Sequence, residues 1–144
     1  MRALVSAAEM RAAEEEAARR GLTSTALMQL AGRGAAGVLL AHSGGTRRRY
    51  LVLAGPGNNG GDALVVAGLL ATARATVQIA TYRRAQASPV DPLAVPRFDC
   101  GADPGLERLR AALLDCDVVV DGLLGTGKAR PIEADLAAIL GEVR

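Results

Sequence analysis

The sequence predicts an α/β fold: a Rossmann-like, three-layer α/β/α arrangement around a parallel sheet, preceded by N-terminal helices. After residue 50, short and continuously apolar runs, typical of strands buried on both faces, alternate with helical patterns. Glycine-rich turns follow two of these runs, at the end of the sheet where its ligands bind. With 144 residues, 50% of them hydrophobic, the chain has the size and composition of a single domain.

Two helices are expected before the sheet. Ser6 and Glu9 form a Ser-x-x-Glu capping box for a helix over residues 7–20. A second helix is expected from about residue 24 to residue 43, with one apolar face and several small residues that suggest close packing against another element. The apolar face comprises Leu27, Leu30, Gly34, Val38 and Ala41, and the small residues are Ala31, Gly32, Gly34 and Gly37.

Three strands and three helices are expected to follow in alternation. The strands are predicted at residues 50–54, 75–81 and 117–121, and the helices at residues 62–73, 104–115 and 132–143. Pro89, Pro92 and Pro96 exclude regular structure through most of residues 83–99. Because parallel strands present their carboxyl ends at one edge of the sheet, both glycine-rich turns are predicted to lie at that edge.

Composition disfavours several classes of function. The 17 basic and 15 acidic residues leave a net charge of +2, too weak a field to attract nucleic acid or an anionic membrane. One Phe, two Tyr and no Trp leave little to stack on exposed bases. The single histidine, His42, argues against a zinc site built from a His cluster. Cys100 and Cys116 are too widely spaced for a CxxC motif and predict reduced thiols in a cytoplasmic protein.

The first glycine-rich turn, residues 55–62, reads Gly-Pro-Gly-Asn-Asn-Gly-Gly-Asp and satisfies G-x-G-x-x-G between a strand and a helix. Such glycines let main-chain N–H groups approach a pyrophosphate at a helix N-terminus. A dinucleotide site would add a ribose-binding acid about 20 residues on, where this chain carries residues 82–84, Tyr-Arg-Arg. The polar Asn58, Asn59 and Asp62 are also unusual for a phosphate turn. The structural alternative is a tight turn with Asp62 as the helix N-cap.

The second turn, residues 122–128, nearly matches a Walker A loop. It is followed by Ala129, where a Ser or Thr must hold magnesium, and this disfavours an NTPase. Asp121 closes the preceding strand, so its carboxylate should emerge at the same sheet edge as Asn59 and Asp62. Oxygen ligands of this kind suit a hard cation. Capping of the following turn by Asp121 is the structural alternative.

Four segments in order carry a family resemblance. They are residues 8–15 in the opening helix, residues 27–32 (Leu-Met-Gln-Leu-Ala-Gly), residues 55–62, and residues 120–127 with Arg130 and Pro131. Together they resemble the NAD(P)H-hydrate epimerase family, also described as the YjeF N-terminal domain. Two positions depart from the usual pattern: Gln29 replaces a Glu, and Ala63 replaces a common Gly.

The resemblance implies an isomerase that interconverts the R and S forms of hydrated NADH and NADPH, written NADHX and NADPHX, in nicotinamide cofactor repair. It further implies a homodimer and a potassium ion with Asn59 and Asp121 as ligands. Asp62, beside the glycines, is the candidate catalytic acid/base. The implied substrate-binding residues are Asn58, Asn59, Gly60, Gly61, Asp62, Gly125, Thr126, Gly127, Lys128, Ala129, Arg130 and Pro131.

Members of this family continue for several more strands, through an Asp-x-Pro-Ser-Gly segment that residues 1–144 lack. We therefore expect an epimerase domain that is incomplete at its C-terminus, either from an epimerase or from the front of a bifunctional repair enzyme with a dehydratase domain. The alternative is a catalytically silent nucleotide-binding or scaffolding module, because the same domain resembles part of an mRNA-decapping scaffold and a fold alone does not establish catalysis.

Overall fold

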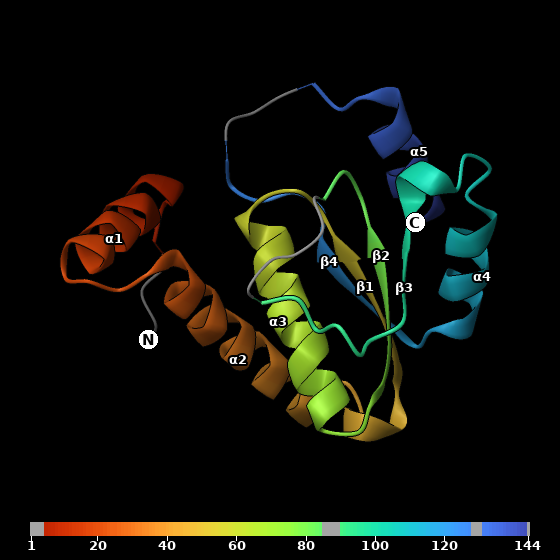
Figure 1. The fold of residues 1–144 in the computed structure, drawn as a ribbon, viewed down its shortest axis with the longest axis horizontal. Helices are drawn as coiled ribbons and strands as arrows, with labels where there is room; N and C mark the ends of the chain where they lie inside the picture. Colours follow the sequence, from red (N-terminus) through yellow and green to blue (C-terminus); the bar gives the residue numbers. More distant parts are fainter. Residues whose placement is uncertain (1–4, 85–89, 128–130, 144) are drawn as a thin grey trace.

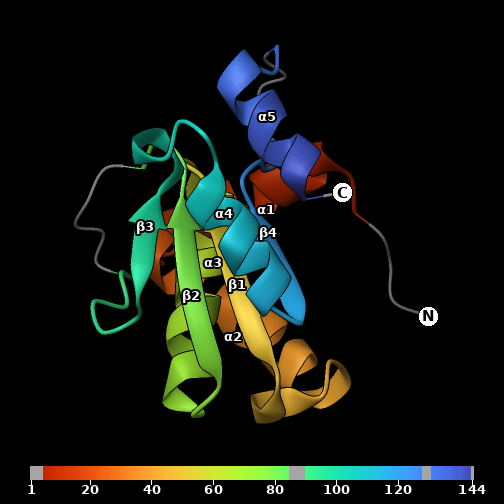
Figure 2. The ribbon, with the colours of Figure 1, turned by 90° about the vertical axis from the view of Figure 1, so that its right-hand side faces the viewer.

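A computed structural model describes residues 5–84, 90–127 and 131–143, in which four parallel strands form one sheet. The strands are β1 (Arg49–Ala54), β2 (Thr76–Thr81), β3 (Arg97–Asp99) and β4 (Val118–Gly122). Their order is β3-β2-β1-β4, which Figure 2 shows from left to right. Every pairing is parallel, so the predicted sheet type is confirmed.

One strand, β3, was not among the three predicted. It begins directly after Pro96, whose carbonyl oxygen accepts a hydrogen bond from Ile79 of β2 at 2.9 Å. A proline is tolerated at this place because the strand is at the edge of the sheet. Phe98 of β3 is buried in the core. Pairing with β2 and burial of one aromatic ring thus define a strand that its short, proline-flanked sequence does not reveal.

Helices cover both faces of the sheet, which confirms the three-layer architecture. α3 (Asn58–Thr72) lies on one face with α2 (Ser24–His42) packed against it, and α4 (Glu107–Asp115) and α5 (Ala134–Glu142) lie on the other (Figure 1). Side chains along β1 alternate between two cores: Tyr50 and Val52 pack beneath α3, and Leu51 and Leu53 pack beneath α4 and α5. Two single-turn 3-10 helices, η1 (Gly45–Arg47) and η2 (Cys100–Ala102), complete the elements of the described residues.

The N-terminal helices form as predicted. α1 (Ala7–Arg19) begins with the capping box, in which the N–H of Ser6 donates to Glu9 Oε2 at 2.7 Å and the N–H of Glu9 donates to Ser6 Oγ at 3.3 Å. Thr23 is the N-cap of α2, its hydroxyl accepting from the N–H of Ala26 at 3.1 Å. α1 buries none of its residues, so it adds nothing to the core.

The predicted apolar face of α2 is not the face that packs. Leu30 and Val38 are 58% and 59% exposed. The helix instead packs its opposite side, with Gly32 and Ala36 buried. A β-carbon at Gly32 would lie 2.4 Å from Cγ1 of Val65 in α3, so a glycine here lets the two helices approach closely. Of the small residues predicted to pack closely, Gly32 does so, whereas Ala31, Gly34 and Gly37 are exposed, and the large apolar residues pointed to the wrong face.

α3 begins four residues earlier than predicted, at Asn58 rather than Asp62. Its N-cap is Gly57, so the proposed capping role of Asp62 is wrong. The reason is that Gly60 and Gly61 are accommodated inside the helix, although glycine in a helix interior is unfavourable. The polar residues of the first glycine-rich turn therefore form the first turn of α3.

α4 begins at Glu107, later than the predicted start at residue 104. Asp103, which is buried, accepts hydrogen bonds from the N–H groups of Glu107 and Leu109, each at 3.1 Å. A side chain that satisfies two free N–H groups of a helix defines where the helix begins. The sequence signal of Pro104 therefore marks the turn before α4 rather than its first residue.

Candidate functional site

The two glycine-rich turns lie side by side at the carboxyl edge of the sheet. β2 and β3 extend the sheet on one side of β1, and β4 lies on the other side. Ligands of open α/β sheets bind at such a reversal of strand order. The N–H of Gly55 donates to the carbonyl oxygen of Gly122 at 3.1 Å, and Asn59 Nδ2 donates to that of Leu124 at 2.6 Å. These bonds join the turn after β1 to the turn after β4.

A cavity of about 540 Å³ opens between the two turns. We call it the switch-point cavity. It brings together most of the site residues predicted from the first turn and from residues 125–127, and it adds two side chains from α1. Its lining comprises Arg11, Glu14, Gly57, Asn58, Asn59, Gly60, Asp62, Leu123, Leu124, Gly125, Thr126 and Gly127.

The other predicted substrate-binding residues that the structure describes, Gly61 and Pro131, are not in this lining. Gly61 is buried in the first turn of α3, where a β-carbon would lie 2.7 Å from Sδ of Met28. Pro131 is exposed before α5. Lys128, Ala129 and Arg130 fall outside the described residues. The structure therefore brings together the first turn and the beginning of the second.

The first turn of α3 presents main-chain N–H groups to the cavity. No side chain in the described part of the chain caps this helix at Gly57. The N–H groups of its first turn are thus available to an anion, and the helix dipole favours negative charge there. A β-carbon at Gly60 would lie 2.0 Å from the carbonyl oxygen of Gly55. Only glycine at residue 60 lets the chain turn this tightly from β1 into α3.

Asp62 lies one turn into α3 and is partly buried. Burial raises the pKa of its carboxyl group above the usual range, and the negative charge of Glu14 raises it further. A raised pKa brings a carboxyl group closer to the range in which it can both donate and accept protons near neutral pH. Asp62 is therefore suited to the acid/base role for which it is a candidate.

A second hollow, of about 290 Å³, adjoins the switch-point cavity between α1, α2 and the start of α3. The two share Glu14, Asn58 and Asp62 in their linings. The second hollow is otherwise mainly apolar, with walls formed by Ala18, Leu22, Leu27, Met28 and Ala31. Asp62 thus lies where the switch-point cavity meets a mainly apolar hollow.

Arg84 contacts the first turn, and sequence reasoning missed this role. Its Nη1 donates to the carbonyl oxygens of Gly55 at 2.7 Å and Gly57 at 3.1 Å. The C=O and N–H of a trans peptide point in opposite directions. The hydrogen bond that orients the Gly57 carbonyl therefore also sets the direction of the Asn58 N–H. The sequence offers no signal for this contact beyond the position of Arg84 just after β2, where an acid was sought.

Arg83 and Tyr82 attach the end of β2 to the start of α5. Arg83 forms ion pairs with Glu133 at 2.7 Å and with Asp135 at 2.8 Å. The hydroxyl group of Tyr82 donates to Asp135 at 3.1 Å, and the guanidinium of Arg83 lies 5.2 Å from the centre of the Tyr82 ring. These contacts fix the chain shortly after the second glycine-rich turn.

Asn59 and Asp121 offer oxygen atoms near the place where the two turns meet. A β-carbon at Gly122 would lie 3.1 Å from the main-chain oxygen of Asn59. Asp121 is exposed and does not line the switch-point cavity; its Oδ1 accepts from the N–H of Leu123 at 2.9 Å, as expected of a turn-capping residue. Within the described ranges, no group of three or more His, Cys, Asp or Glu side chains could hold a metal ion.

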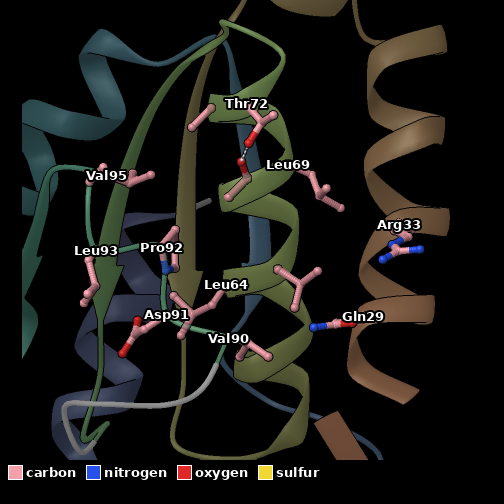
Figure 3. A pocket seen from close by; sticks show the side chains of 14 residues that line it. Gln29, Arg33, Leu64, Leu69, Thr72, Val90, Asp91, Pro92, Leu93 and Val95 are labelled. Atoms are coloured by element: carbon pink, nitrogen blue, oxygen red, sulfur yellow. Dashed lines mark hydrogen bonds between the residues drawn. The ribbon is translucent and has the colours of Figure 1, made fainter. Parts of the chain in front are cut away.

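A slightly larger cavity lies elsewhere, along the outer side of α3 (Figure 3). It has a volume of about 580 Å³ and lies between Gln29 and Arg33 of α2, residues 64–72 of α3 and residues 90–95. Asp91 in its wall pairs with Arg97 at 2.7 Å. It contains neither glycine-rich turn. The switch-point cavity is therefore the better candidate site despite its slightly smaller volume.

No helix in the described part of the chain is long and apolar enough to cross a membrane.

The two cysteines do not form a reactive centre. Cys100 and Cys116 are both free thiols, as predicted, and burial raises the pKa of Cys100 to about 11. A thiol with such a pKa is protonated and unreactive at neutral pH. Cys100 is therefore not a candidate nucleophile.

Comparison with known proteins identifies relatives of this chain. It is 39% identical over 143 residues to the bifunctional NAD(P)H-hydrate repair enzyme Nnr of Thermosynechococcus vestitus, covering 98% of this chain and 28% of that enzyme. It is 32% identical to the NAD(P)H-hydrate epimerase of Limosilactobacillus fermentum, covering 96% of this chain and 67% of the relative. With the corresponding Bordetella pertussis epimerase the identity is 38%, over 94% and 57% of the two chains. The chain thus spans less than a third of the bifunctional relative and more than half of the epimerases.

A solved structure and a family model agree with this similarity. The crystal structure of yeast ynu0 matches the fold with a TM-score of 0.79 and 23% sequence identity, covering 99% of this chain and 65% of the yeast chain. The model of the family described as YjeF-related protein N-terminus matches residues 24–144, which include both glycine-rich turns and every strand described above. This chain is a member of the YjeF-related N-terminal domain family.

Proposed function

We propose that this chain acts as an NAD(P)H-hydrate epimerase, an isomerase that interconverts the R and S hydrates of NADH and NADPH in cofactor repair. The observation that carries the proposal is the switch-point cavity, where the first turn of α3 meets the turn after β4. Relatives named for this activity share most of this chain's length. The uncapped N–H groups of α3 and the partly buried carboxyl group of Asp62 in this cavity also support the proposal.

The diphosphate of the substrate is proposed to bind at the N-terminus of α3. Uncapped N–H groups there would donate to phosphate oxygens. Residues 125–131 are proposed to contact the substrate from the second turn, of which Gly125 to Gly127 line the cavity. A diphosphate bound there leaves the hydrated ring in the same cavity as Asp62. Asp62 lines both the switch-point cavity and the second hollow.

Asp62 is proposed as the acid/base. In the protonated state it would donate its proton to the ring hydroxyl group, which leaves as water while the ring-nitrogen lone pair forms an iminium. Water then adds to the opposite face of the same carbon, and the released proton returns to the carboxylate. Substrate and product are isomers, so no oxidant or reductant is needed. The raised pKa of Asp62 favours this exchange of one proton in both directions.

A potassium ion is proposed as the cofactor, with Asn59 and Asp121 among its ligands. Asn59 uses its amide nitrogen on Leu124, which leaves its side-chain oxygen available, and Asp121 keeps one carboxylate oxygen beyond its bond to Leu123. Oxygen donors alone fit a hard cation better than a transition metal. The ion would offset negative charge near the diphosphate. Calorimetric titration of the chain with NADPHX, with and without potassium, tests this, because an unchanged affinity for NADPHX would exclude the potassium ion.

A cytoplasmic homodimer is the proposed state of the protein. The exposed side of α2 carries Leu30 and Val38 with the exposed small residues Gly34 and Ala41 between and beside them. Apolar surface of this kind is suited to contact with a second copy of the chain. Sedimentation of the wild type and of Leu30→Glu tests this, because a monomeric wild type would exclude the proposed dimer.

The test of the proposed function follows the loss of the R epimer of NADPHX by chromatography. Wild type should convert it to the S form, and Asp62→Asn should lose at least about 100-fold in rate, the usual contribution of a general acid/base. Asp115→Asn is the matched control, because Asp115 is exposed just before β4, at the opposite edge of the sheet. Undiminished turnover in Asp62→Asn would contradict the assignment of Asp62 as the acid/base. An inactive wild type that still binds the hydrate would favour the silent nucleotide-binding module instead.

A further inference from the structure

One face of α1 is turned toward the candidate site. Arg11, Glu14, Glu15 and Ala18 recur at the spacing that places residues on the same side of a helix. Arg11 and Glu14 line the switch-point cavity, and Glu14, Glu15 and Ala18 line the adjoining hollow. Figure 1 shows α1 (red) on the same side of the sheet as α3. The family model begins at residue 24 and does not include this helix.

α1 has no role in the core that would explain its position. None of its residues is buried. The two arginines at its C-terminal end are used locally: Arg19 and Arg20 both pair with Glu16, each at 2.7 Å. Arg11 takes part in none of the ion pairs and hydrogen bonds of the described residues. A guanidinium on the cavity wall is thus available to a ligand.

The charged side chains that line the cavity affect how an anionic ligand could bind there. Among the described residues that line it, Arg11 is the single basic residue, and Glu14 and Asp62 are the two acids. A dinucleotide diphosphate carries two negative charges, which these carboxylates would repel. An arginine in the same lining as the helix N-terminus counters that repulsion, and its planar guanidinium matches two phosphate oxygens at once.

We propose that Arg11 is a substrate-binding residue whose guanidinium holds the diphosphate of NAD(P)HX from the side opposite the N–H groups of α3. The proposal rests on the proposed function, since it concerns the same cavity and substrate. It makes α1 a wall of the site that closes over the diphosphate. It also assigns the site a residue that lies before the segment matched by the family model.

The experiment is calorimetric titration of the chain with ADP-ribose, which carries the diphosphate but no nicotinamide, and with NADPHX. Arg11→Gln should bind both about 10-fold more weakly than wild type, the loss of one charge-assisted contact. Arg11→Lys should keep part of the affinity, and Arg11→Glu should lose more than Arg11→Gln. Binding by wild type should weaken as salt is raised, and binding by Arg11→Gln should weaken less.

Arg20→Gln is the matched control, because it removes the same charge at the end of the same helix, from a residue that pairs with Glu16 and does not line the cavity. Its affinity should equal that of wild type. Melting temperatures of all variants should agree, since Arg11 is exposed. Equal affinities of wild type and Arg11→Gln would overturn the role of Arg11 while the proposed function stands. Failure of wild type to bind either ligand would overturn the proposed function together with that role.

Discussion

The carboxyl group of Asp62 owes its properties to two neighbours of different kinds. Partial burial in the first turns of α3 disfavours its charged form, and the carboxylate of Glu14 across the shared hollow disfavours it further. Both effects raise the pKa of Asp62. The sequence predicted Asp62 as the candidate acid/base from its place beside the glycines. It could not predict Glu14 as a neighbour, because that depends on how α1 lies against α3.

Replacing Glu14 with Gln should shift the pH dependence of turnover. Loss of the negative charge makes ionisation of Asp62 easier, so its pKa falls. The limb of the kcat/KM profile that reports Asp62 should therefore move to lower pH, whether the group acts first as acid or as base. Glu107→Gln, on the far face of the sheet, is the control. A limb that stays in place in Glu14→Gln would contradict the coupling between the two carboxyl groups.

At the scale of elements, local signals predicted some structures well and others poorly. The capping box of α1 and the buried strand β1 each depend on a few adjacent residues, and both were predicted. The packed face of α2 was not, since it depends on Val65 of α3 lying against Gly32. The start of α3 at Asn58 was also missed, because glycines and asparagines resemble a loop until the contacts with Gly55 and Leu124 are known.

Gly57, the N-cap of α3, and Gly60, in its first turn, should respond differently to alanine. At Gly60 a β-carbon would meet the Gly55 carbonyl oxygen at 2.0 Å, so Gly60→Ala should lower the free energy of unfolding by about 1–3 kcal/mol. At Gly57 a β-carbon meets no atom within 4 Å, and its backbone suits alanine. Gly57→Ala should therefore keep the stability of wild type but bind ADP-ribose more weakly, because the methyl group lies where phosphate approaches.

Denaturant unfolding and calorimetry together check this pair. Gly127→Ala extends the test to the second turn, because a β-carbon there also meets no atom of the described residues within 4 Å. A Gly57→Ala protein that binds as tightly as wild type would show that the ligand does not approach this part of the backbone. A fully stable Gly60→Ala protein would show that the turn into α3 can relax.

Across the whole molecule, strand order determines where the chemistry can occur. Alternating strands and helices predicted a doubly wound parallel sheet, and the order β3-β2-β1-β4 places the reversal between β1 and β4. Both glycine-rich turns follow these two strands, which is why motifs about 65 residues apart in the sequence form one cavity. Sequence alone predicted the common edge. It could not predict that α1 and Arg84 would complete the surroundings of the first turn.

The most direct test of the proposed site is a crystal structure of the chain grown with NADPHX in a potassium buffer. We expect a diphosphate against the N–H groups of Asn58 and Asn59, with the hydrated ring beside Asp62. We also expect the guanidinium of Arg11 on the opposite side of the diphosphate. A ligand bound instead in the cavity between Arg33 and residues 90–95, or a diphosphate away from the first turn of α3, would contradict the proposed site.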